Sequence, residues 1–165
     1  MKALPTKTHV LMLTMLALFV HTASGALPHL KVSDNKRFLV TETGQPFFWL
    51  ADTTWEIFHR LNREESMRLF EDRAKKGFNV LQSVAIAEFD GHTEPNAYGH
   101  LPFVDLDVTK PAVKDGPQND YWDHVDFIVT EANRRGLYIG FLPTWGRFWH
   151  DTNQALGNFK LSFNS

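Results

Sequence analysis

The sequence has 165 residues, of which 43% are hydrophobic, 13% aromatic and 22% charged, a composition typical of a globular protein. A formal charge of -2 argues against nucleic acid or an anionic lipid surface as a partner, because both attract strongly basic proteins. The sequence contains no cysteine, which excludes disulfides, thiol nucleophiles and cysteine-bound metals.

The first residues have the pattern of a secretory signal peptide. Lys2 and Lys7 precede the apolar run Val10–Val20, and small residues follow at 23–26. The apolar run is too short to cross a bilayer of about 30 Å at about 1.5 Å per residue, so a retained membrane anchor is the weaker alternative. We expect residues 1–25 to be removed and residues 26–165 to be secreted or periplasmic, without membrane contact after cleavage.

Extended segments open the mature chain. Lys31–Val32 and Arg37–Thr41, separated by the polar turn 33–35, predict a small β-hairpin. After a second turn near Gly44, the apolar run Phe47–Ala51 lacks alternation. This run predicts a strand that is covered on both faces in a parallel sheet.

A helix and a strand follow. Asn62 and Glu65 have the spacing of a capping box at the start of the helix, and Gly77 marks its end. Residues 78–84 then predict a buried strand. The chain next enters a connection of about 33 residues, 85–117, without a convincing helix, and loops of this length are usually functional.

A second helix and strand, with the same pattern of cap and terminal glycine, are predicted later in the chain. Asn119 or Asp120 caps a helix, Gly136 ends it, and residues 137–142 predict a third strand. Repeated β-α units predict an α/β fold, either a (β/α)8 barrel or a doubly wound open sheet. The turn 52–55 lacks the glycines with which open sheets bind nucleotides, so the barrel is preferred and no nucleotide cofactor is expected.

Polar and aromatic side chains gather where the predicted strands end. In a barrel these ends form the catalytic face, and carboxylates beside flat rings suit a carbohydrate, whose C–H patches stack on rings. The candidate substrate-binding residues from this placement are Asp52, Trp55, Gln82, Glu88 and Trp145. Four of them have a structural alternative: a turn cap for Asp52, rim packing for Trp55, a backbone partner for Gln82 and simple solvation for Glu88. The histidines lack metal-ligand spacing, so neither a metal nor another cofactor is expected.

Four segments, in this order along the chain, resemble the apiosidase-like glycoside hydrolases. They are Phe47–Trp55, Gly77–Gln82, Asp90–Gly99 and Gly136–Gly146. The resemblance implies a (β/α)8 catalytic domain and release of apiose from pectic side chains of the plant cell wall. It also adds Tyr98 to the expected pocket wall, beside Asp52, Trp55, Gln82 and Trp145.

The catalytic residues remain unknown, because the resemblance implies that the family's acid pair lies on later strands that this sequence lacks. A complete barrel takes about 250 residues. We therefore expect an incomplete barrel: about three strand-helix units behind an N-terminal hairpin, inactive alone and prone to self-association through open sheet edges. The alternative is a non-catalytic carbohydrate-binding or adhesive protein that keeps the aromatic surface. A third hypothesis, catalysis by Asp52 and Glu88 in an oligomer, is weaker.

Overall fold

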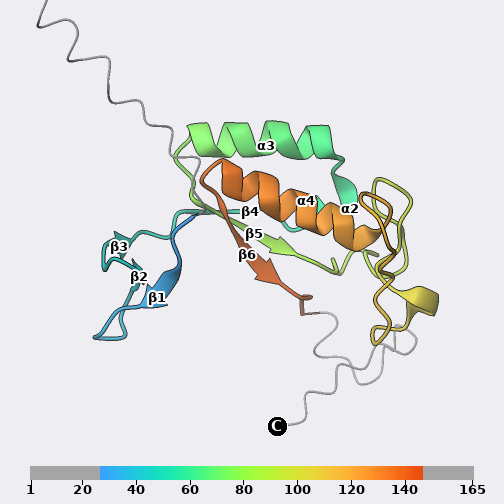
Figure 1. The fold of residues 1–165 in the computed structure, drawn as a ribbon, viewed down its shortest axis with the longest axis horizontal. Helices are drawn as coiled ribbons and strands as arrows, with labels where there is room; N and C mark the ends of the chain where they lie inside the picture. Colours follow the sequence, from blue (N-terminus) through green and yellow to red (C-terminus); the bar gives the residue numbers. More distant parts are fainter. Residues whose placement is uncertain (1–26, 147–165) are drawn as a thin grey trace, which may run out of the picture.

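The computed structural model describes residues 27–146, a mixed α/β fold with two three-stranded sheets (Figure 1). The expected signal peptide and the residues after 146 lie outside this part of the chain. Within it, no helix is long and apolar enough to cross a membrane.

The first sheet is antiparallel. It comprises β1 (Leu30–Val32), β2 (Leu39–Thr41) and β3 (Pro46–Phe47) in the order β1-β2-β3. Leu30 pairs with Thr41 and Val32 with Leu39, which confirms the predicted hairpin. The third strand was not predicted.

The second sheet is parallel and contains β4 (Ala51–Thr53), β5 (Val80–Val84) and β6 (Tyr138–Leu142). Its order, β4-β5-β6, follows the chain, and the register places Thr53, Gln82 and Gly140 side by side. Sequential order is what the first strands of a barrel would have, while closure of a barrel stays a prediction.

The predicted strand Phe47–Ala51 is wrong in its position. Phe47 ends β3, the next three residues are exposed coil, and the parallel strand begins only at Ala51. The cause is Asn79, whose side chain donates to the Phe48 carbonyl at 2.6 Å and accepts from the Leu50 amide at 2.9 Å. Because these backbone groups bond to the Asn79 side chain, they do not form the hydrogen-bond ladder with a neighbouring strand.

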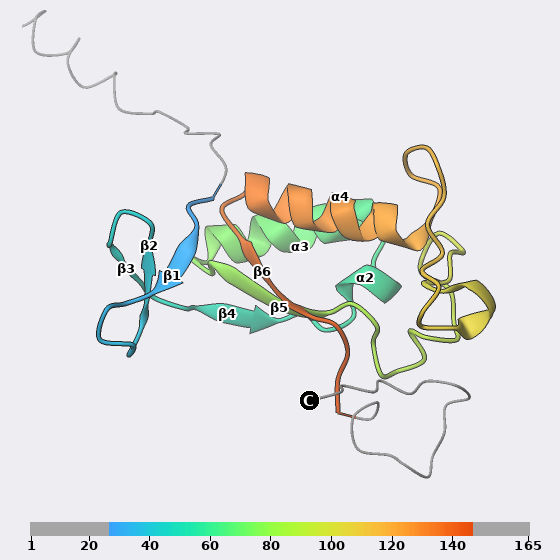
Figure 2. The same cartoon turned by 60° about the horizontal axis from the view of Figure 1, so that its bottom comes forward.

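Two long helices cover one face of the parallel sheet, and a short helix precedes them (Figure 2). α3 (Arg63–Lys75) begins with the predicted capping box of Asn62 and Glu65, and α4 (Tyr121–Arg134) is capped by the Asp120 side chain. The short α2 (Ile57–Arg60) was not predicted.

Both long helices end in the same way. The glycines at 77 and 136 have φ values of 84° and 79°. The next amide in the chain reaches back five residues, from Phe78 to Arg73 at 3.1 Å and from Leu137 to Ala132 at 3.0 Å. These are Schellman ends, and they turn each helix directly into the following strand.

The main core lies between the helices and the parallel sheet. Phe58, Phe70, Leu81 and Ile128 are fully buried there, from α2, α3, β5 and α4 respectively. Because Leu81 faces the helices, its neighbours in β5, including Gln82, face the opposite side of the sheet.

The long connection after β5 is ordered around a single 3₁₀ turn, Val104–Leu106, within the described residues. Trp122 Nε1 donates to the Pro102 carbonyl at 2.9 Å, and Phe103 is buried in the core. The connection therefore lies at the end of the sheet where β5 and β6 finish, opposite the small antiparallel sheet (Figures 1 and 2).

Candidate functional site

Trp55 and Trp145 meet at the carboxyl ends of β4 and β6. Their ring centroids lie 4.7 Å apart with an interplanar angle of 52°. The Trp145 residue is 37% exposed, and the buried Trp55 Nε1 has no hydrogen-bond partner among residues 27–146. Residues 90 positions apart thus form one aromatic surface where the sequence placed a sugar site.

Backbone and hydroxyl contacts fix the two segments that carry these rings. The Thr54 amide donates to the Gln82 carbonyl at 2.9 Å, and the hydroxyls of Thr54 and Ser83 lie 2.8 Å apart in the interior. The Thr144 hydroxyl donates to the Ile86 carbonyl at 3.2 Å. Both tryptophans are therefore held against β5 and its extension, so the surface is set by the sheet.

Gln82 and Asp52 point to opposite sides of the sheet. Gln82 is half-buried and faces away from the helices, beside Thr53 and Gly140 in the register. The Asp52 carboxylate instead forms an ion pair with Arg73 of α3, with 26% of its side chain exposed. The structure thus gives Asp52 a partner in the helical layer, and its expected contact with substrate stays a prediction.

Tyr98 lies in the connection after β5 and contacts the two long helices. Its hydroxyl accepts from the Arg63 amide at 2.8 Å, and its ring centroid is 5.1 Å from that of His124 in α4. Glu88 is half-buried at the start of the same connection. The substrate contacts expected of Tyr98 and Glu88 stay predictions.

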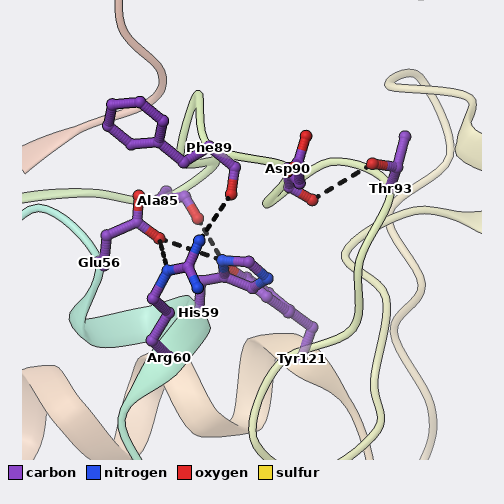
Figure 3. A network of polar contacts seen from close by, with 8 residues as sticks. All are labelled: Glu56, His59, Arg60, Ala85, Phe89, Asp90, Thr93 and Tyr121. Atoms are coloured by element: carbon purple, nitrogen blue, oxygen red, sulfur yellow. Dashed lines mark hydrogen bonds and ion pairs between the residues drawn. The ribbon is translucent and has the colours of Figure 1, made fainter.

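A polar network that sequence reasoning missed surrounds α2 (Figure 3). Glu56 Oε2 lies 3.1 Å from His59 Nδ1 and accepts from Arg60 Nε at 3.0 Å. Burial raises the pKa of Tyr121, and the negative charge of Glu56 raises it further to a smaller extent. The Tyr121 hydroxyl donates to the Ala85 carbonyl at 2.6 Å. Tyr121 therefore stays a neutral phenol that anchors α4 to the end of β5.

The network borders a polar cleft between α2 and the connection. The cleft has a volume of about 400 Å³ and is lined mainly by His59, Arg60, Asp90, Glu94 and Asn96. Only the spacing of Glu56, His59 and Arg60 on one helical turn could have signalled it, because the facing residues come from a loop. Across the described residues, no group of three histidine, aspartate or glutamate side chains is arranged to hold a metal ion.

Comparison with known proteins identifies the family. The family model described as "Apiosidase-like, catalytic domain" matches residues 33–162. Among solved structures, the chain is similar to a glycoside hydrolase family 5 protein from Bacteroides vulgatus, with 35% identity and a TM-score of 0.63. That match covers 75% of this chain and 26% of the other.

A second solved structure, titled only "Glycoside hydrolase", is 36% identical with a TM-score of 0.63, again over 75% of this chain and 26% of the other. No curated protein matches. The chain therefore spans about a quarter of the length of the structures it resembles. The family match extends over most of the sequence, and the chain belongs to the apiosidase-like family.

Proposed function

We propose that the chain forms the amino-terminal part of a secreted glycoside hydrolase that acts on pectic side chains of the plant cell wall, with residues 1–25 as its export signal. The observation that carries the proposal is the Trp55–Trp145 surface at the carboxyl ends of β4 and β6 in a chain of this family. Aromatic rings at this edge of a parallel sheet offer a sugar its stacking face.

The sequential parallel strands β4, β5 and β6 support a (β/α)8 barrel, of which they would be the first three strands. Gln82 faces the side of the sheet away from the helices, where the interior of such a barrel would lie. The match to only 26% of two glycoside hydrolase structures supports the expectation that the catalytic acid pair comes from the remaining part. Hydrolysis needs two carboxylates that flank the bond.

Titration with apiose-containing oligosaccharides tests the sugar surface. We expect Trp55→Ala and Trp145→Ala each to weaken binding by about fivefold or more, since a buried aromatic anchor contributes more than about 1 kcal/mol. Phe48→Ala is the matched control: it removes a ring that is 77% exposed beside β3, and it should leave affinity unchanged. Equal affinities for the wild type and both tryptophan variants would refute the proposed surface.

Three further measurements test the function and its alternatives. Asp52→Asn tests the predicted substrate contact of Asp52: a loss of affinity would support the contact, and unchanged affinity would limit the carboxylate to its ion pair with Arg73. The chain alone should bind without hydrolysing the oligosaccharide, and release of apiose by the purified chain would contradict the expected origin of the acid pair. A full-length relative that binds but never hydrolyses would favour the non-catalytic carbohydrate-binding alternative.

A further inference from the structure

The polar cleft beside α2 is distinct from the aromatic surface, since neither Trp55 nor Trp145 lines it. His59 and Arg60 form its helical side, and Asp90, Glu94 and Asn96 form the side of the connection. Its lining offers hydrogen-bond donors from one side and two carboxylates from the other, whereas the neighbouring core is apolar.

The helical side of the cleft is held in place before any ligand binds. Glu56 engages both His59 and Arg60, and Arg60 Nη2 donates to the Phe89 carbonyl at 3.3 Å (Figure 3). The Ala97 amide donates to the His59 carbonyl at 3.1 Å, which joins α2 to the opposite wall. A site with fixed walls loses little side-chain freedom when a ligand enters.

Asn96 supplies the observation that points to a ligand. The residue is only 4% exposed, and its Oδ1 accepts from the amides of Tyr98 at 3.0 Å and His100 at 3.1 Å. Its Nδ2 is buried and has no hydrogen-bond partner among residues 27–146. Buried donors are almost always satisfied, so the unpaired side-chain N–H of a residue that lines the cleft indicates a place for a further acceptor.

We propose that this cleft binds the hydroxyl groups of a neutral sugar unit that lies farther along the chain held by Trp55 and Trp145. A hydroxyl both donates and accepts, so it can accept from Asn96 Nδ2 and donate to the carboxylates of Asp90 and Glu94. Those carboxylates disfavour a uronate at the same place, because like charges repel. Glu56 follows Trp55 directly in sequence and contacts His59 and Arg60, so the residue next to the aromatic surface holds the helical side of the cleft. This inference rests on the proposed function.

Two variants remove cleft groups without touching the aromatic surface. Glu94→Ala removes an exposed carboxylate and keeps the backbone amide that donates to the Asp90 carbonyl. Asn96→Asp keeps the Oδ1 acceptor for Tyr98 and His100 but replaces the Nδ2 donor. Glu64→Ala on α3 is the matched control, since its side chain is 79% exposed and it does not line the cleft. Circular dichroism checks that all three variants fold like the wild type.

The probes are apiose itself and a longer neutral oligosaccharide that ends in apiose, measured by calorimetry on the whole chain. We expect Glu94→Ala and Asn96→Asp each to weaken binding of the oligosaccharide by about fivefold, the effect of one lost hydrogen bond, and to leave binding of apiose unchanged. Glu64→Ala should change neither.

The outcomes distinguish this inference from the function on which it rests. If Trp55→Ala weakens binding of the oligosaccharide but neither cleft variant does, the cleft is not a subsite and the proposed function stands. Equal losses for apiose and for the oligosaccharide in the cleft variants would also overturn a separate subsite. If the wild type binds neither sugar, the proposed function and the cleft both fail.

Discussion

Asp52, Thr54 and Trp55 lie within four residues of one another and face three different surroundings. The Asp52 carboxylate binds Arg73 in the helical layer, the Thr54 hydroxyl bonds to Ser83 inside the fold, and Trp55 meets Trp145 at the end of the sheet. Asp52 and Thr54 are two positions apart and lie on the same side of the sheet, where they have different partners, whereas Trp55 lies beyond the end of β4. A substitution at one of these positions therefore reports on one contact of the molecule.

His124 of α4 should make the stability of the fold depend on pH. Burial lowers the pKa of His124 to about 4, against 6.5 for an ordinary histidine; its hydrogen bond to the Leu61 carbonyl works in the other direction. The charges of Arg63 and His100 lower this pKa further. Between these two values the unfolded chain binds a proton that the folded chain does not, so stability falls as pH falls from about 6.5 to about 4.

Urea unfolding across this pH range measures the effect, which amounts to about 3 kcal/mol when the whole window is crossed. His124→Gln keeps a side-chain donor for the Leu61 carbonyl and should remove this part of the pH dependence. The exposed His29 offers a control, because His29→Gln should preserve the wild-type slope. An identical slope in wild type and His124→Gln would show that another group is responsible.

At the scale of elements, the two helix-to-strand junctions use the same device and should respond alike to the same change. Gly77 and Gly136 both have positive φ, and in each case the space where a Cβ would lie is open. Gly77→Ala and Gly136→Ala should each cost about 1 kcal/mol of unfolding free energy, because an L side chain is strained in the left-handed region.

Chemical denaturation measures both values. Gly146→Ala is the control, since Gly146 also has open space around its Cβ position but no positive φ, and its replacement should not destabilise the chain. If the three variants lost the same free energy, strain in the left-handed region would not be the cause.

The elements that the sequence predicts correctly depend on local chemistry. Asn62 and Glu65 form a capping box, and Gly77 ends the helix, through contacts within a few residues. The Phe47–Ala51 strand was misplaced because its outcome depends on Asn79, a residue about 30 positions away in the chain. An apolar run indicates that a segment is buried or paired with another strand. It does not indicate that a side chain distant in sequence, such as that of Asn79, bonds to the backbone of the run.

The candidate site divides in the same way. Trp55 and Trp145 could be predicted to lie at the same edge, because the carboxyl ends of parallel strands such as β4 and β6 lie on one edge of a sheet. The role of Asn96 could not be predicted, because its buried N–H results from how the long connection folds back on α2. Position at a strand end is readable from a sequence, whereas burial within a long loop is not.

At the scale of the whole molecule, the parallel sheet has two edges that the described residues leave unpaired. β5 is flanked by β4 and β6, and neither outer strand has a second partner among residues 27–146. Phe141 of β6 is 46% exposed and contacts Phe58 of the core, with ring centroids 5.6 Å apart. The unpaired N–H and C=O groups of an open edge offer a template for pairing with another chain, and an exposed apolar residue adds to this tendency.

We therefore predict that the purified chain self-associates through β6. Sedimentation velocity should show dimers or larger species whose proportion rises with concentration, and Phe141→Lys should shift the population towards monomer, because a charge on an edge strand opposes pairing. Phe48→Lys introduces the same charge at a ring that is 77% exposed beside the antiparallel sheet, and it should leave the association unchanged. A monomer at all concentrations would contradict pairing through the open edge, and equal effects of both variants would place the contact elsewhere.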